Sequence, residues 1–296
     1  NVLPLRPNVR VLVTGPNANS VRSLNGGWTY TWQGEKTNEY GKQFNTILKS
    51  LQNKLGAANV VFVPGVEYNE TGRYDADRVI DFKAVTDAAK NVDYILFCIG
   101  ENSYAETPGN TNDLSLSENQ MKLAEALKGT GKPVIFILNE GRPRIFNKIE
   151  SIADGILHVY LPGNYGADAL ADIITGKVNP SGKLPFTYPR YVNDLVSYIH
   201  KPSEGSSNPQ GGETNPQYPF GYGVSYTSFA YSSLTISKSE FGPEELAVIS
   251  IIVTNKGSQA GKEVVQLYVS DLVASLTPDV KRLRAFEKVE LKPGES

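Results

Sequence analysis

The sequence predicts an α/β fold built on a mostly parallel sheet, followed by a small all-β sandwich. Five short runs of β-branched and aromatic residues occur in the first two-thirds of the chain, with amphipathic stretches between them. Each run is mostly apolar rather than alternating, which is typical of strands that are buried on both faces of a parallel sheet. Beyond residue 229 the helical patterns stop, and apolar runs separated by turn signals remain.

The five predicted strands each end beside a Gly or an Asn. They cover residues 9–15, 59–65, 92–100, 133–139 and 155–163. Strands that alternate with helices form an open sheet, and such sheets bind their ligands at the carboxyl ends of the strands. The loops that follow these runs are therefore the expected location of a functional site.

Two predicted helices carry start or stop signals. The first helix has an apolar stripe that consists of Phe44, Ile47, Leu48 and Leu51. Gly56 is its expected C-cap. The second helix starts at Ser117 as N-cap, and Gln120 three residues later completes the pattern of a capping box.

The composition divides the chain into three parts. Residues 1–200 form the predicted α/β domain, residues 201–228 a linker or wrapping loop rich in Gly, Pro, Ser and Asn, and residues 229–296 the β part. A complete immunoglobulin-like sandwich has about 100 residues and seven strands, so we expect the β part to be incomplete. The chain starts without Met and stops directly after a turn signal. We therefore also expect it to be part of a longer protein.

The overall composition excludes several classes of function. The chain has 296 residues, a net charge of -2 and no basic run, so nucleic acid is not an expected partner. No apolar stretch reaches the roughly 18 residues of a membrane span. His158 and His200 are far apart in the sequence, and we expect no metal site. Cys98 is the only cysteine and lies in an apolar run, where it is expected to act as a small core hydrophobe.

Candidate catalytic residues lie in the loop after the third predicted strand. Its sequence, GENSYAETPGN, contains Glu101 and Glu106. Hydrolysis of a glycosidic bond needs one carboxyl group that donates a proton and an opposed carboxylate that acts as nucleophile or base. A Pro-Gly loop at a strand end is able to present such an acid. The alternative is a solvated connection, because most glutamates in loops only face water.

Both tryptophans of the chain occupy one Gly-rich stretch, LNGGWTYTWQGE, which follows the first predicted strand. In a parallel sheet this stretch lies at the same edge as Glu101 and Glu106. Sugar rings carry C–H groups that stack on indole, so Trp28 and Trp32 are candidate sugar-binding residues. Packing in the core is the alternative interpretation.

The loop after the fourth predicted strand, NEGRPRIF, is also polar. A helix that began among Asn139, Glu140 and Arg142 would bind an anion at its N-terminus. We expect instead a salt bridge between loops.

Taken together and in this order, the motifs resemble glycoside hydrolase family 3, the β-glucosidase and exo-β-glucanase family, over nearly the whole chain. The markers are NVLPL, GGWTYTWQG, GENSYAETPGNTNDLSLSENQ, GKPVIFILNEGRP, PGNYGADALADIITGKVNPSGKLPFTYPR, YPFGYGVSYTSFAYS and VTNKGSQAGKEVVQLYVSD. The resemblance implies a (β/α)8-type barrel that precedes this region, then an α/β sandwich, then a fibronectin type III-like domain. It implies a hydrolase without cofactor that acts on β-glucosides or β-glucan oligosaccharides, in the periplasm or outside a bacterial cell.

The resemblance also implies roles for individual residues. Glu106 of YAETPG matches the general acid/base of the exo-glucanase branch, and Glu101 of GEN has a supporting role. Trp32 and Trp28 match aromatic residues that flank the leaving-group subsite. The aspartate nucleophile belongs to the barrel and is not in this chain, so the isolated chain is expected to be inactive. Two alternatives are a non-catalytic sugar-binding or scaffold module and a fragment with no function of its own.

Overall fold

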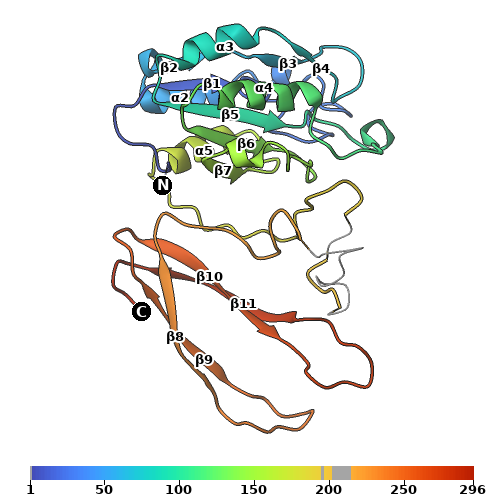
Figure 1. The fold of residues 1–296 in the computed structure, drawn as a ribbon, viewed down its shortest axis with the longest axis vertical. Helices are drawn as coiled ribbons and strands as arrows, with labels where there is room; N and C mark the ends of the chain where they lie inside the picture. The colour runs from blue at the N-terminus through green and yellow to red at the C-terminus, as the bar shows by residue number, and fades with distance from the viewer. Residues whose placement is uncertain (1, 195–196, 202–214) are drawn as a thin grey trace. The chain divides into compact units, whose positions relative to one another are not determined.

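A computed structural model describes residues 2–194, 197–201 and 215–296. The chain divides into two compact units (Figure 1), here named the α/β unit (Asn1–Val178 and Pro189–Leu195) and the β unit (Asn179–Tyr188 and Val196–Ser296). The predicted linker of residues 201–228 lies partly outside the described residues, since residues 202–214 do not belong to them.

The α/β unit is built on a five-stranded sheet in which all neighbouring strands are parallel. In sheet order the strands are β2 (Val60–Phe62), β1 (Val11–Thr14), β5 (Tyr94–Gly100), β6 (Val134–Asn139) and β7 (Gly155–His158). Each lies within one of the five predicted runs, so the predicted parallel α/β fold is confirmed. β2 is shorter than predicted because Pro64, which has no N–H to donate, follows it closely.

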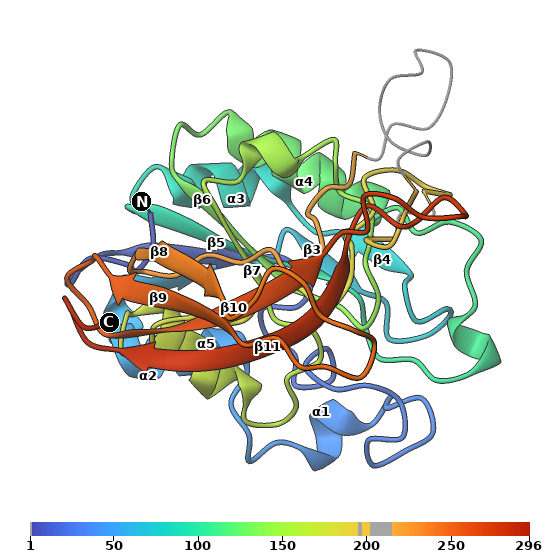
Figure 2. The ribbon, with the colours of Figure 1, turned by 90° about the horizontal axis from the view of Figure 1, so that it is seen from below.

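Helices cover both faces of this sheet (Figure 2). On one side α2 (Ile47–Leu55) contacts α5 (Gly166–Ile174), and on the other side α3 (Phe82–Ala89) contacts α4 (Glu118–Lys128). Short helical turns complete the unit: α1 (Thr37–Tyr40), η1 (Ala57–Asn59), η2 (Thr107–Gly109) and η3 (Glu150–Ile152). Strands that are apolar on both faces require such cover, because neither face tolerates water.

The core lies on both faces of the central strands. Leu96, Cys98 and Ile137 pack with α2 and α5 in one buried cluster. Phe97 and Phe136 alternate with them and therefore point to the opposite face, where their ring centroids lie 5.5 Å apart. Cys98 is fully buried, which confirms its predicted role as a core hydrophobe and raises the pKa of its thiol.

The predicted end of α2 at Gly56 is confirmed, but Phe44, which was expected on the apolar stripe of this helix, precedes its first residue. The backbone N–H of Lys49 donates a hydrogen bond to Oγ1 of Thr46, the residue that precedes the helix. The helix stops at Gly56, whose φ of 85° suits a residue without a side chain. Local sequence therefore sets both boundaries of this helix.

One half of the predicted capping box of α4 is confirmed and the other is wrong. Ser117 caps the helix by accepting a hydrogen bond from the Gln120 N–H at 3.4 Å. The Gln120 side chain, however, does not reach back to Ser117. It pairs with the last residue of β5, since the Gly100 N–H donates to Oε1 at 3.0 Å and Nε2 donates to the Gly100 carbonyl at 3.2 Å. Gln120 thus anchors β5 directly before the loop that holds the two candidate glutamates.

An antiparallel hairpin that was not predicted lies beside the same strand ends. It consists of β3 (Val66–Tyr68) and β4 (Asp77–Val79), joined by residues 69–76. Strands of three residues are too short to show an alternating pattern. The Tyr68 hydroxyl bonds to Asn17 Oδ1 at 2.9 Å and to the Gly100 carbonyl at 3.0 Å, which ties the hairpin to the ends of β1 and β5.

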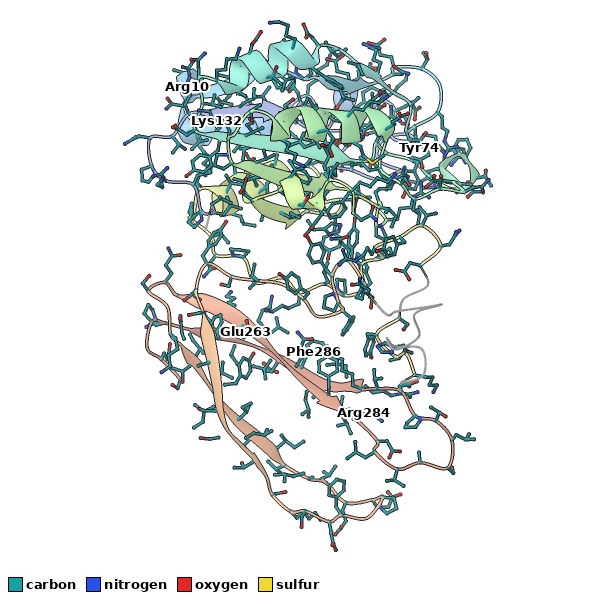
Figure 3. The ribbon with its side chains drawn as sticks, in the orientation of Figure 1. Arg10, Tyr74, Lys132, Glu263, Arg284 and Phe286 are labelled. Carbon is teal, nitrogen blue, oxygen red and sulfur yellow. The ribbon has the colours of Figure 1, made fainter. Side chains whose placement is uncertain are left out.

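The β unit contains two antiparallel pairs of strands. β8 (Phe229–Ile236) pairs with β9 (Ile249–Asn255), and β10 (Gly261–Val269) pairs with β11 (Arg282–Leu291). The predicted all-β texture is confirmed. In the described part of this unit the four named strands fall short of the seven of a complete sandwich. Large apolar side chains such as Leu234 and Phe286 remain exposed on them, and Phe286 is labelled in Figure 3.

We predict that Gln120→Ala lowers the free energy of unfolding by about 1–3 kcal/mol, because the buried Gly100 N–H loses this partner. Denaturant unfolding measures the change. Glu125→Ala, on the exposed side of the same helix, is the matched control and should leave stability nearly unchanged. Equal losses in the two variants would contradict an anchoring role for Gln120.

Candidate active site

The candidate site lies where the order of strands in the sheet changes direction. From β1 the chain continues to β2 on one side, whereas from β5 it continues to β6 and β7 on the other side. Because β1 and β5 are parallel neighbours, the loops that follow them leave the sheet side by side. Open α/β sheets bind ligands at such a switch point. In Figure 3, Tyr74 lies at this end of the unit, and Arg10 and Lys132, which precede β1 and β6, lie toward the other.

Two loops form the site: the tryptophan loop (residues 24–35) and the glutamate loop (residues 101–110). Their backbones are in direct contact, since the Gly27 N–H donates to the Tyr104 carbonyl at 3.0 Å. A Cβ atom on Gly27 would lie 2.4 Å from the Ala105 Cβ, so only glycine permits this approach. Below the loops, Asn17 Nδ2 donates to the Glu101 carbonyl at 3.0 Å and to the Asn139 carbonyl at 3.2 Å. The structure therefore brings together the two stretches that the sequence singled out.

Glu101 is a buried carboxylate at the base of the glutamate loop. Its Oε1 accepts hydrogen bonds from Arg142 Nε at 3.0 Å and from Arg144 Nη1 at 3.1 Å. Its Oε2 accepts from the Gly141 N–H and from the Tyr104 hydroxyl, each at 3.3 Å. The predicted salt bridge between loops is confirmed for Arg142, with Glu101 as its partner. A carboxylate with these four partners joins the glutamate loop to the loop that follows β6.

Aromatic rings extend this base toward the hairpin. The Arg142 guanidinium lies 4.2 Å from the centre of the Tyr104 ring and also donates a hydrogen bond to the Tyr74 hydroxyl. The rings of Tyr74 and Tyr104 have centroids 4.6 Å apart. Burial, followed by the negative charge of Glu101, raises the pKa of the Tyr104 hydroxyl well above its usual value. Tyr104 therefore stays protonated and remains a donor to Glu101 at neutral pH.

Glu106 lies further along the same loop in the opposite environment. Its side chain is exposed, and within the described part of the chain its carboxylate has no hydrogen-bond or ion-pair partner. Its backbone has φ 53° and ψ -145°, a conformation that glycine normally adopts. Holding a non-glycine residue there costs on the order of 1–3 kcal/mol, and such strain is concentrated at functional sites. The fold therefore fixes the direction of the Glu106 backbone while leaving its carboxylate available.

A pocket of about 350 Å³ opens beside these loops. Its walls come from Arg22, from the tryptophan loop (Trp32, Gln33 and Glu35), from residues 69–74 of the hairpin, and from Asn102 and Pro108 of the glutamate loop. Trp32 and Trp28 are 45% and 70% exposed, so the alternative that they pack in the core is wrong. The pocket thus combines an aromatic face with polar and charged groups, a combination typical of small-molecule sites.

The charges at the pocket come mainly from residues that the sequence analysis did not single out. Backbone hydrogen bonding, followed by a hydrogen bond from the Thr31 hydroxyl at 2.8 Å, lowers the pKa of Glu35, which keeps it ionised at neutral pH. Arg22 donates from Nε to Ser103 Oγ at 2.7 Å, and burial lowers its pKa. Gln33 follows Trp32 in the quoted motif, so its position was an available signal. Arg22 and Tyr74 reach the site only through the tertiary fold, and no local pattern marks them.

The polar residues after β6 do not form an anion site. No helix begins among residues 140–149. The Asn139 side chain donates to the Tyr160 carbonyl, and Glu140 Oε1 lies 3.1 Å from His158 Nε2. These residues join the ends of β6 and β7 rather than facing a ligand.

Among residues 2–194, 197–201 and 215–296, no group of three or more His, Cys, Asp or Glu side chains is placed to hold a metal ion. Within the same ranges no helix has the length and apolar character needed to cross a bilayer.

Comparisons with known proteins agree with these motifs. Residues 1–226 match the model of the glycosyl hydrolase family 3 C-terminal domain, and residues 263–296 match that of the fibronectin type III-like domain. The lysosomal beta glucosidase of Dictyostelium discoideum is 40% identical over all of this chain and 37% of its own length. The periplasmic beta-glucosidase of Salmonella typhimurium is 33% identical over 99% of this chain and 41% of its own length.

Solved structures of beta-glucosidases are also similar to this chain. A mutant beta-glucosidase of Listeria innocua, crystallised with laminaribiose, superposes with a TM-score of 0.80 at 30% identity. The match covers 99% of this chain and 40% of that one. The chain therefore spans about two fifths of the length of these relatives.

We predict that Glu101→Gln lowers the free energy of unfolding by about 3 kcal/mol, because the buried Arg144 and its neighbour Arg142 lose their counter-charge. Urea unfolding measures the loss. Glu118→Gln breaks the exposed Glu118–Lys122 pair and should change stability immeasurably, since exposed ion pairs contribute little. If Glu101→Gln were no more costly than this control, the buried network would not hold the loops.

A second prediction concerns backbone strain at Glu106. Glu106→Gly should be more stable than Glu106→Ala by about 1 kcal/mol, because only glycine adopts φ 53° without strain. Thermal unfolding compares the two variants. The same pair of substitutions at Glu125, inside α4, should give the reverse order, because glycine is the poorer helix former. The same order at both positions would refute the strain.

Proposed function

Because the chain belongs to glycosyl hydrolase family 3, we propose that it forms the acid/base half of a retaining β-glucosidase or exo-β-glucanase. In this proposal the chain supplies Glu106 as general acid/base and Trp32, with Trp28, as the aromatic wall of the leaving-group subsite. A barrel domain of the same full-length protein supplies the nucleophilic carboxylate and binds the terminal glucose. Two domains then share one active site.

The observation that carries the proposal is the exposed carboxylate of Glu106, in the loop whose residues Asn102 and Pro108 line the pocket. A general acid must reach the glycosidic oxygen and must be free to exchange a proton. Glu106 meets this requirement because it is exposed, and Pro108 two residues later lines the pocket. Glu101 does not meet it, because it is buried and both of its oxygens already accept hydrogen bonds from neighbouring groups. The supporting role proposed for Glu101 is to hold the base of the loop.

The chemistry follows the two-step course of retaining glycosidases. The barrel carboxylate attacks the anomeric carbon while Glu106 gives its proton to the departing oxygen, and the two carboxyl groups stand roughly 5–5.5 Å apart. Glu106, now ionised, then takes a proton from the water that cleaves the glycosyl-enzyme. Trp32 stacks against the leaving group during the first step. The carboxylate of Glu35 accepts hydrogen bonds from the hydroxyls of the leaving group, and the side chains around Glu35 donate to them or accept from them.

The relatives support a β-linked glucoside as substrate. Two of them are described as beta-glucosidases, and the Listeria structure holds laminaribiose, a disaccharide of glucose. The open pocket, with an indole wall and ionised rim, suits a leaving group that is itself a sugar. The Salmonella relative is described as periplasmic, which supports a location outside the cytoplasm for this protein as well.

We predict that Glu106→Ala in the full-length protein slows hydrolysis of alkyl β-glucosides about 10²–10⁴-fold, the usual contribution of general acid catalysis. Activated aryl β-glucosides need little protonation, so their kcat/KM should change far less. Azide should raise the turnover of the variant by attacking the glycosyl-enzyme without general-base help. Steady-state kinetics on the two classes of substrate, with and without azide, measure these effects.

Glu118→Ala, at an exposed position of α4, is the control and should behave as the parent protein. The assignment is wrong if Glu101→Ala gives the leaving-group and azide pattern and Glu106→Ala does not. If Glu106→Ala has no effect while Trp32→Ala abolishes glycan binding, the chain is a sugar-binding module instead. The isolated chain should hydrolyse neither class of substrate, because it carries one of the two carboxyl groups.

A further inference from the structure

The position of Glu106 must be set through its backbone. Its carboxylate has no partner within the described residues, and its side chain is exposed. Rotation of the peptide that joins Ala105 to Glu106 would change the direction in which the Glu106 side chain leaves the loop. Whatever fixes that peptide therefore fixes the acid. The residue before Glu106 is the place where such a restraint acts most directly.

The side chain of Gln33 supplies this restraint. Its Nε2 donates to the Ala105 carbonyl at 3.0 Å, and its Oε1 accepts from the Ala105 N–H at 2.9 Å. One carboxamide thus satisfies both backbone groups of Ala105, in the way that a neighbouring strand would. Ala105 is buried, so water does not readily replace these two bonds.

Gln33 is itself held in place. Its backbone carbonyl accepts a hydrogen bond from the Ser103 hydroxyl at 2.7 Å, and the Ser103 hydroxyl oxygen accepts one from Arg22 Nε. The next residue, Gly34, packs so closely that a Cβ atom there would lie 2.8 Å from Ser103 Oγ. Both the backbone and the side chain of Gln33 are therefore hydrogen-bonded to the glutamate loop, which restrains Gln33 between the two loops.

The neighbour of Gln33 on the other side is Trp32, whose exposed indole lines the pocket. Gln33 therefore links the aromatic wall to the residue that precedes Glu106. We propose that Gln33 is a positioning residue that sets the distance between Trp32 and Glu106, so that the proton donor meets a leaving group stacked on the indole. This inference rests on the proposed function of Glu106 as general acid.

The test uses the full-length protein with Gln33→Met, which keeps the length of the side chain and removes both hydrogen bonds. We expect kcat/KM for an alkyl β-glucoside to fall about 10–100-fold, which is part of the general-acid contribution. For 2,4-dinitrophenyl β-glucoside, kcat/KM should change less than about threefold, because that leaving group needs no proton. Gln33→Glu keeps the acceptor for the Ala105 N–H but sets a carboxylate oxygen against the Ala105 carbonyl, so its loss should be at least as large as that of Gln33→Met.

A double-variant comparison separates positioning from direct contact with substrate. In a Glu106→Ala background the further change Gln33→Met should have almost no effect on either substrate, because the group that it positions is gone. Gln43→Met, at an exposed position outside the site, is the matched control. Hydrogen exchange of the Ala105 amide gives a structural readout, and it should accelerate in Gln33→Met but not in the control.

Two outcomes overturn the inference alone: equal losses on both substrates, or losses that add in the double variant. Either would mean that Gln33 binds substrate directly or only supports the fold. A different outcome overturns the proposed function as well. In that case Glu106→Ala does not discriminate between the two leaving groups, whatever Gln33→Met does.

Discussion

The parallel pairing of β1 with β5 is the constraint on which the candidate site depends. It makes two loops that are far apart in the sequence leave the sheet as neighbours, at the point where the strand order reverses. Gly15 shows how close this approach is, because a Cβ atom there would lie 2.2 Å from the Cys98 carbonyl oxygen. Asn17 then ties the two strand ends together through the Glu101 and Asn139 carbonyls. A single change of strand order would separate Trp32 from Glu106.

The two glutamates of one loop show how environment divides roles between identical side chains. Glu101 is buried among two arginines, a tyrosine hydroxyl and a backbone N–H, so its charge holds the loop in place. Glu106, five residues later, is exposed on strained backbone and keeps its carboxylate available. The rigid base is what makes an exposed acid useful, since a proton donor on a flexible loop would rarely meet the glycosidic oxygen.

Sequence reasoning predicted the parts of this structure that depend on local pattern. Apolar runs located all five strands of the parallel sheet, and Gly56 marked the end of α2. The start of α2 was not predicted, because Thr46 caps the helix after Phe44. Sequence reasoning could not predict where long side chains find their partners. Gln120 fits a capping box by spacing, yet its side-chain amide forms hydrogen bonds with the backbone of Gly100. Arg142 pairs with Glu101, although Glu140 is closer to it in the sequence. The hairpin of β3 and β4 was not predicted, because its three-residue strands are too short to show an alternating hydrophobic pattern.

In the proposed mechanism, Glu106 delivers a proton to a leaving group held against Trp32. The most direct test is a crystal structure of the full-length protein with a thio-linked β-glucose disaccharide, which resists hydrolysis. The Glu106 carboxyl should lie within hydrogen-bond reach of the linking sulfur, roughly 3 Å away, with the second sugar ring stacked on Trp32. The proposed mechanism would be contradicted if another carboxyl group approached that sulfur while Glu106 pointed into solvent.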